Sequence, residues 1–239
     1  MERTKIALVT GSSGGIGRAI AVRLARDAAG VAVHYLKRHE EARKTAADVL
    51  NKGAQAVIFC ADLTQERRAA ALVRAVEREF SRVDILVNTV GPMIMKPWDR
   101  VSAREWISIY EANLLSSLAC MKAALPGMRK RGFGRIINLG YSRVEHLSAF
   151  PTVTPYAAAK TGLLILTRTA AVSERSAGIT VNMVSPGLIE GGRLPAGVKI
   201  PESMLGRFED VAEAVAFLAS EEAGRITGTN LIVAGAWKM

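Results

Sequence analysis

Short, nearly continuous apolar runs alternate with longer segments of mixed character along almost the whole chain. The first run, Ile6-Ala7-Leu8-Val9, contains no polar residue at alternate positions. Such a run is typical of a strand that is covered on both faces, as in a parallel sheet. Seven runs of this kind predict strands at Lys5–Thr10, Val31–Tyr35, Ala56–Cys60, Asp84–Asn88, Arg135–Leu139, Thr180–Val184 and Asn230–Val233.

The longer segments between these runs carry apolar residues at the spacing of an amphipathic helix. They predict helices at Ile16–Asp27, Glu40–Lys52, Thr64–Phe80, Ala103–Arg131, Pro155–Ser176 and Phe208–Ser220. Strand–helix alternation with right-handed crossovers builds a doubly wound parallel sheet with helices on both faces. Residues 1–239 are therefore predicted to form a single α/β domain of the Rossmann type with seven strands. The segment 190–206, rich in Gly and Pro, is expected to be a loop over the site.

Composition limits the class of protein. With 239 residues, of which 49% are apolar, the chain is long enough to bury the core of one domain. No apolar run is long enough to span a bilayer, and charged residues precede the first strand, so neither a membrane span nor a signal peptide is expected. Cys60 and Cys120 lie far apart without metal-ligand spacing. They are expected to be reduced cysteines of a cytoplasmic protein, and no metal site is predicted.

The net charge of +10 raises the question of a polyanionic partner. The basic residues are spread along the chain, and the densest run, Arg129-Lys130-Arg131, falls at a predicted helix end. Cations at that end complement the helix dipole. A solvated helix terminus is therefore favoured, and no nucleic-acid partner is predicted. The second interpretation is an electropositive rim for an acidic carrier protein or a phosphorylated substrate.

A glycine-rich turn, Thr-Gly-Ser-Ser-Gly-Gly-Ile-Gly, follows the first predicted strand. Glycines let the backbone approach a phosphate closely, and a helix N-terminus supplies free N–H groups and positive potential. After the first strand of an alternating chain, such a turn predicts a site for the pyrophosphate of a dinucleotide. The candidate binding residues are Thr10, Gly11, Ser12, Ser13, Gly15, Ile16 and Gly17.

A second candidate lies far downstream, in Tyr156-Ala157-Ala158-Ala159-Lys160. A Tyr and a Lys four residues apart project from one face of a helix. An ammonium near a phenol favours its ionised form, so the Tyr156 phenol is expected to exchange a proton at neutral pH. A Tyr-x-x-x-Lys pair also occurs by chance in many helices. Here the glycine-rich turn upstream makes the chance explanation improbable.

The charges after the second predicted strand indicate which cofactor is bound. A site for NAD usually has Asp or Glu about 20 residues beyond the turn, accepting hydrogen bonds from the ribose 2′-hydroxyl. Here Lys37 and Arg38 follow the strand, and the first acidic residue is Glu40. The two cations would attract the 2′-phosphate of NADP, so NADP (NADPH) is favoured over NAD. The alternative is that both are ordinary exposed loop residues.

With these motifs the chain resembles the classical short-chain dehydrogenase/reductase family, from about Lys5 to Ala234. The turn is similar to the family's Thr-Gly-x-x-x-Gly-x-Gly motif. The resemblance implies the same single-domain fold and a nicotinamide cofactor. It also implies cofactor contacts after the third, fourth and sixth strands, at Asp62, Leu63, Asn88, Gly91, Pro186, Gly187 and Ile189.

Four positions depart from the family pattern. Thr89 and Val90 replace the middle of its Asn-Asn-Ala-Gly motif. Gly14 stands where many NADP-dependent relatives carry a basic residue. Gly191 stands where many relatives have a hydroxyl residue that binds the carboxamide or phosphate, so that contact is expected to be missing.

The resemblance further implies a catalytic group. Tyr156 would transfer the proton, and Lys160 would also bond the nicotinamide ribose, so both count as cofactor-binding and catalytic residues. Asn113, in the long predicted helix before the fifth strand, would hold a water in a proton relay. The alternative for Asn113 is a buried polar residue that caps a kink in the helix.

The fourth member of the catalytic group is harder to assign. Relatives place a Ser thirteen residues before the Tyr, where it hydrogen-bonds the substrate carbonyl, but that spacing falls on Arg143 here. Gapless alignment from the fifth strand puts Tyr141 at the Ser position, with Ser142 next to it. We choose Ser142 because its small hydroxyl can stand beside a substrate without filling the pocket. Tyr141 is the alternative, because a phenol can also donate.

Three segments resemble the beta-ketoacyl-[acyl-carrier-protein] reductase branch of the family, although other reductases share them: Gly134-Arg135-Ile136-Ile137-Asn138, Tyr156-Ala157-Ala158-Ala159-Lys160 and Gly178-Ile179-Thr180-Val181-Asn182. The implied function is NADPH-dependent reduction of a carbonyl to an alcohol on a small-molecule or carrier-linked substrate. One alternative is the same chemistry on a sugar or cyclic ketone. Another is a nucleotide-binding regulatory protein with little turnover. The resemblance also implies a homotetramer, formed through the two long helices and the last strand.

Overall fold

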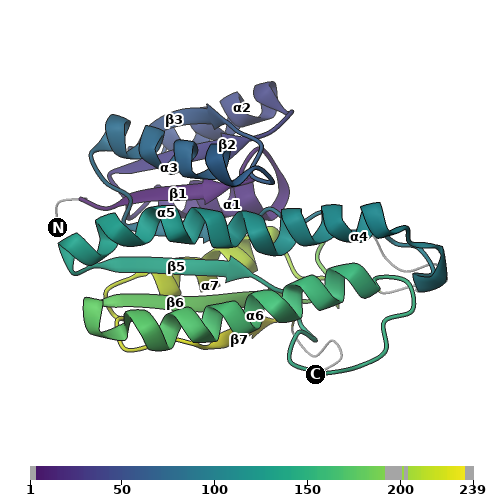
Figure 1. The fold of residues 1–239 in the computed structure, drawn as a ribbon. Coiled ribbons are helices and arrows are strands. Elements are labelled where there is room, and N and C mark those ends of the chain that lie inside the picture. Colours follow the sequence, from purple (N-terminus) through teal and green to yellow (C-terminus); the bar gives the residue numbers. More distant parts are fainter. Residues whose placement is uncertain (1–3, 192–200, 202–203, 235–239) are drawn as a thin grey trace.

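Among residues 4–191, 201 and 204–234, which the computed structural model describes, seven strands form one parallel sheet (Figure 1). Their order is β3-β2-β1-β4-β5-β6-β7, so the direction of winding reverses between β1 and β4. This is the predicted doubly wound sheet of the Rossmann type. The strands are β1 Ile6–Thr10, β2 Gly30–Tyr35, β3 Gln55–Cys60, β4 Ile85–Asn88, β5 Gly134–Leu139, β6 Ile179–Pro186 and β7 Asn230–Val233.

Helices cover both faces of the sheet, as the strand–helix alternation predicts. The helices are α1 Gly15–Leu24, α2 His39–Leu50, α3 Glu66–Phe80, α4 Ala103–Tyr110, α5 Ser116–Arg131, α6 Thr154–Glu174 and α7 Phe208–Ala219. Helices α1, α2 and α7 share one apolar cluster with the sheet, and α3, α5 and α6 share another. Within the described residues, no helix is both long and apolar enough to cross a bilayer.

The central strands bring their carboxyl ends to one edge of the sheet. β1, β4, β5 and β6 are buried along their whole length, because helices pack on both of their faces. The register pairs Thr10 with Asn88, and Asn88 with Asn138. In open α/β sheets, ligands bind outside this edge at the point where the winding reverses.

The ends of the predicted helices differ from the observed ones by up to three residues. α3 begins at Glu66 and not at Thr64, because the Asp62 carboxylate accepts hydrogen bonds from the backbone N–H (3.1 Å) and the hydroxyl (2.7 Å) of Thr64 and holds a turn there. The predicted helix 103–131 contains a π-helical turn, Glu111–Leu115, between α4 and α5. Such turns occur often at functional sites.

Most of the predicted loop 190–206 lies outside the described residues. The flanking backbone forms an isolated parallel bridge between Ile189 and Gly206. The Gly206 N–H donates to the Leu188 carbonyl (2.9 Å), and the Glu190 N–H donates to the Gly206 carbonyl (3.0 Å). The two ends of the segment therefore meet just beyond β6.

Candidate active site

A cleft of about 650 Å³ opens at the carboxyl ends of the strands. This is the volume of a typical small-molecule site. Segments far apart in the sequence form its walls. They are the glycine-rich turn, the residues after β4, β5 and β6, and the first turns of α6, including Gly11, Gly14, Gly15, Ile16, Gly17, Thr89, Gly91, Leu139, Ser142, Tyr156, Lys160, Pro186, Gly187 and Ile189.

The glycine-rich turn is crowded at Gly11 and leaves no room for a side chain at Gly17. Gly11 has φ +65°, in the left-handed region that favours glycine. A Cβ added to Gly17 would lie 2.5 Å from the Gly11 carbonyl oxygen. The turn therefore brings bare backbone and the N-terminus of α1 to the wall of the cleft, which suits a phosphate group.

A buried histidine that the sequence analysis did not single out fixes this turn. The Gly11 N–H donates to His34 Nδ1 (2.9 Å), and His34 Nε2 lies 3.0 Å from the Ala61 carbonyl oxygen. An imidazole with these partners is neutral and carries its proton on Nε2. Burial lowers the pKa of His34, which favours this neutral form.

Ser12 belongs to the same network. Its hydroxyl donates to the Val9 carbonyl (2.7 Å) and accepts the His34 N–H (3.1 Å). These two hydrogen bonds of the buried Ser12 side chain hold the turn against β2. Neither Ser12 nor Ser13 is among the described residues that line the cleft. Ser12 therefore makes structural hydrogen bonds, and its predicted contact with the cofactor stays a prediction.

Two hydroxyl residues join the turn to the end of β4. The Thr89 hydroxyl donates to the Thr10 carbonyl (2.5 Å), and the Thr89 N–H donates to the Thr10 hydroxyl (3.1 Å). The Asn88 amide instead donates to Asn138 Oδ1 (2.9 Å), and the Asn138 amide donates to the Thr167 hydroxyl (2.9 Å). Thr89, one of the departures from the family motif, thus lines the cleft and links the end of β4 to the glycine-rich turn by hydrogen bonds.

The predicted 2′-phosphate residues lie at the edge of the turn. Lys37 and Arg38 are both exposed. A Cβ added to Gly14 would lie 3.8 Å from Arg38 Nη1, so the Arg38 guanidinium stands beside the turn. The Arg38 guanidinium therefore lies where the side chain of a basic residue at position 14 would begin.

The two residues after β3 have different surroundings. The Asp62 carboxylate is bonded within its own turn, chiefly to Thr64, whose hydroxyl lowers the pKa of Asp62. The Leu63 side chain is buried in the cluster beneath α3. Neither residue is among the described residues that line the cleft, so any contact with a nucleotide lies beyond this pocket.

Tyr156 and Lys160 lie on one face of α6 and both line the cleft. Lys160 is buried, its Nζ donates to the Leu139 carbonyl (2.6 Å), and the Nζ lies 5.7 Å from the centre of the Tyr156 ring. Burial lowers the pKa of Lys160 to about 7.

Burial works against the expected ionised form of the Tyr156 phenol. Burial raises the pKa of Tyr156 above its usual range, and the neighbouring Tyr141 phenol raises it further. Because burial also lowers the pKa of Lys160, its amine is only partly charged at neutral pH and does not offset this rise. In this state the Tyr156 phenol keeps its proton at neutral pH.

Asn113 lies in the π-helical turn and faces the same corner. Its amide donates to the carbonyls of Pro92 (2.9 Å) and Ile109 (3.0 Å), so it supports the irregular turn. Its Oδ1 is buried and has no hydrogen-bond partner among the described residues. A Cβ added to Gly91 would lie 2.8 Å from Asn113 Oδ1 and 3.0 Å from Lys160 Nζ. This glycine leaves a polar space that suits a buried water.

Ser142 and Tyr141 have different environments. Ser142 is half-buried in the cleft wall, where its N–H donates to the Pro186 carbonyl (2.9 Å). The Tyr141 ring packs between Phe150 and Tyr156, at 5.7 and 5.8 Å between ring centres. Burial raises the pKa of Tyr141. The Tyr141 hydroxyl is buried and has no hydrogen-bond partner among the described residues, so Ser142 and Tyr141 both stay predictions for the substrate contact.

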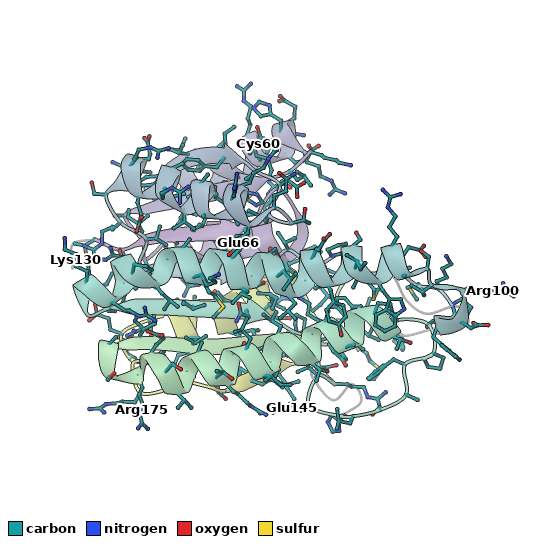
Figure 2. The ribbon with its side chains drawn as sticks, in the orientation of Figure 1. Cys60, Glu66, Arg100, Lys130, Glu145 and Arg175 are labelled. Atoms are coloured by element: carbon teal, nitrogen blue, oxygen red, sulfur yellow. The ribbon has the colours of Figure 1, made fainter. Side chains whose placement is uncertain are left out.

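The basic run at the end of α5 is remote from the cleft. Lys130 lies where α5 ends, next to the amino end of β5, whereas the cleft is at the carboxyl end (Figure 2). Arg129 forms an ion pair with Glu174 (2.6 Å). The run therefore does not line the cleft, and its place at the end of α5 fits the helix-terminus interpretation.

The chain matches known proteins along nearly its whole length. A family model described as Enoyl-(Acyl carrier protein) reductase matches residues 11–237. The chain belongs to the short-chain dehydrogenase/reductase family. It is similar to the 3-oxoacyl-[acyl-carrier-protein] reductase FabG of Staphylococcus aureus, at 36% identity over 100% of both chains. It is also similar to FabG of Haemophilus influenzae, at 38% identity over 97% of both.

A solved structure supports the same family. The acetoin dehydrogenase YohF of Salmonella typhimurium superposes with a TM-score of 0.87 at 31% identity, over 96% of this chain and 94% of that one. The predicted fold is confirmed, and the chain is an oxidoreductase of a family that uses a nicotinamide cofactor.

Several residues of the cleft wall were missed by the sequence analysis as site residues. They are Met93, Arg143, Phe150, Val153, Leu188, Glu190 and Phe208. Most of them lie in loops that follow β4, β5 and β6. No motif marks them, and only the tertiary arrangement brings them together.

Proposed function

We propose that this protein uses NADPH to reduce a carbonyl to an alcohol, with a 3-oxoacyl thioester as the favoured substrate class. The observation that carries the proposal is the meeting of the glycine-rich turn, Tyr156 and Lys160 in one cleft. The similarity to 3-oxoacyl-[acyl-carrier-protein] reductases over the whole chain supports the choice of substrate class.

The preference for NADPH rests on charge. A bound nicotinamide nucleotide supplies the hydride, and this chain provides the groups around it. The exposed Lys37 and Arg38 stand where a 2′-phosphate would need cations, and Arg38 reaches the edge of the turn at Gly14. The first carboxylates after them, Glu40 and Glu41, belong to the first turn of α2.

The chain's own residues can complete a reduction at the carbonyl oxygen. Ser142 would hydrogen-bond that oxygen as its negative charge grows. Tyr156 would donate the proton, and its raised pKa keeps the phenol protonated and ready to donate. Lys160 would hold the ribose and, once charged, would stabilise the resulting phenolate. Asn113, with its free Oδ1, would position the water that returns the proton.

A substrate panel tests the proposal directly. With NADPH, we expect acetoacetyl thioesters to be reduced faster than acetoin, cyclic ketones or sugars, as measured by nicotinamide absorbance. Tyr156→Phe should lower kcat by at least about 100-fold, because general acid catalysis contributes at least this much. Tyr110→Phe, on α4, is the matched control and should leave kcat unchanged.

Each other result has a definite meaning. Faster reduction of acetoin than of thioesters would favour the chemistry named for the Salmonella typhimurium structure. Tight NADPH binding with no turnover on any carbonyl would favour a regulatory nucleotide-binding protein.

We also propose that the protein is a cytoplasmic homotetramer. Large apolar side chains are exposed on the outer faces of α4 and α6, at Ile107, Ile165 and Val172, and at Phe217 and Ile232 on α7 and β7. A contact between copies would remove this apolar surface from water.

A further inference from the structure

Arg143 is a charged group in the cleft wall that the proposed chemistry does not use. It directly follows Ser142 and lines the same cleft. Its Nη2 donates to the Ser148 hydroxyl (3.1 Å), and its guanidinium carbon lies 5.5 Å from the centre of the Phe150 ring. The side chain is half-buried, so it has lost part of its hydration.

No carboxylate among the described residues forms an ion pair with Arg143. Glu145, two residues further on, pairs with Arg168 and also accepts the Asn230 amide (3.2 Å). Glu190 lines the same cleft, but its Oε1 accepts the Phe208 N–H (3.2 Å). The nearby carboxylates therefore have other partners.

A half-buried guanidinium without a counter-ion is a good receptor for an anion. It has given up water without gaining a charged partner, so an arriving oxyanion meets little competition. Its planar set of N–H donors matches the two oxygens of a carboxylate or phosphate. Contact with the Phe150 ring and the bond to Ser148 restrict the plane of the guanidinium before any ligand arrives.

Arg143 lines the same cleft as the catalytic candidates Ser142 and Tyr156. Tyr141, two residues before it, has its ring 5.8 Å from the ring of Tyr156, and Ser142 lies between them in sequence. An anion bound here would belong to the same substrate molecule whose carbonyl is reduced.

We propose that Arg143 binds an oxyanion of the substrate, either the carboxylate of a free oxo acid or the phosphate of a carrier arm. The inference rests on the proposed reductase function and narrows its substrates to anionic carbonyl compounds. A neutral ketone of the same size would lose this contact.

Four substrates separate the two sources of the anion. Acetoacetate carries a carboxylate next to the ketone, and ethyl acetoacetate is its neutral counterpart. Acetoacetyl phosphopantetheine carries a phosphate on its arm, and acetoacetyl N-acetylcysteamine is the matching neutral thioester. KM and kcat are measured for each with the native chain, Arg143→Gln and Arg143→Lys.

We expect Arg143→Gln to raise KM about tenfold or more for one anionic substrate, because a charge-assisted pair is lost. KM for its neutral counterpart should stay within about twofold of the native value. Arg143→Lys should recover part of the loss, because it keeps the charge. Arg175→Gln, an exposed residue near the amino end of β6 and labelled in Figure 2, is the matched control and should change nothing.

The pattern of losses decides the outcome. A selective loss for acetoacetate assigns a carboxylate, and one for the phosphopantetheine thioester assigns a phosphate. Equal changes for charged and neutral substrates, or no change for any of them, would overturn the inference.

A binding measurement separates this inference from the proposed function. Calorimetric titration with 3-hydroxybutyrate, phosphopantetheine and ethyl 3-hydroxybutyrate in the presence of NADP requires no turnover. If Arg143→Gln weakens binding of one of the two anions alone by about tenfold, the anion site stands even where no carbonyl is reduced. Equal affinity of the native and variant chains for both anions would refute it.

Discussion

At the scale of single residues, burial decides the charge of the groups in the site. Lys160 and Tyr156 lie on one helical face, but burial lowers the pKa of the first and raises that of the second. His34, at the other side of the site, is held neutral in the same way while it accepts the Gly11 N–H. Burial thus favours the neutral form of all three groups.

The neutral His34 predicts a specific acid sensitivity. Its folded pKa lies below the ordinary value of 6.5, so the unfolded chain takes up a proton that the folded chain resists. Its contribution to stability is full above about pH 6.5 and is lost as the pH falls through the lowered folded pKa. Urea unfolding from pH 7.5 to 5 should therefore show a falling free energy of unfolding, and NADPH affinity should fall with it because a protonated Nδ1 cannot accept the Gly11 N–H.

Two variants test this assignment. His34→Gln should have a shallower pH dependence of unfolding than the native chain. The matched variant His146→Gln, which changes an exposed histidine, should keep the native slope. An unchanged slope in His34→Gln would show that the acid sensitivity comes from other groups.

At the scale of elements, the segments that connect strands and helices place side chains beside the cleft. The connection from β2 to α2 brings Arg38 to the edge of the glycine-rich turn, beside Gly14. The sequence showed that this connection is positively charged. It did not show that the Arg38 guanidinium lies beside Gly14. The π-helical turn between α4 and α5 is a second case, because it aims Asn113 at the space beside Gly91.

Arg38 predicts a separation between the two nicotinamide cofactors. Arg38→Ala should raise KM for NADPH about tenfold, because a charge-assisted contact with the 2′-phosphate is lost. KM for NADH should change by less than about twofold, because NADH has no such phosphate. Lys44→Ala, an exposed cation on α2, should affect neither. Equal effects of Arg38→Ala on both cofactors would contradict the assignment.

At the scale of the whole molecule, apolar surface on α4 and α6 points to contacts between copies. Ile165 and Val172 expose 63% and 68% of their surface, although both are large apolar residues in the interior of the long helix α6. Their spacing of seven residues puts them on one face, two turns apart.

The exposed apolar surface of α6 predicts that carboxylates placed on it would weaken the contact between copies. Ile165→Glu with Val172→Glu should reduce the particle mass seen by light scattering, because a carboxylate is costly in an apolar contact. Leu50→Glu changes a similarly exposed apolar residue at the end of α2 and should leave the mass unchanged. A monomeric native protein would refute the tetramer, as would an undiminished mass of the double variant.

The sequence by itself determined the strands, the helices and the doubly wound class, because these depend on apolar patterns within a few residues. It also identified the glycine-rich turn and the pairing of Tyr156 with Lys160, since both motifs are local. Only the tertiary structure decided the pKa of Tyr156, the partner of His34, the reach of Arg38 and the place of Arg143 in the cleft. Desolvation and long-range contacts set these properties, and they arise from residues that are brought together across the sheet.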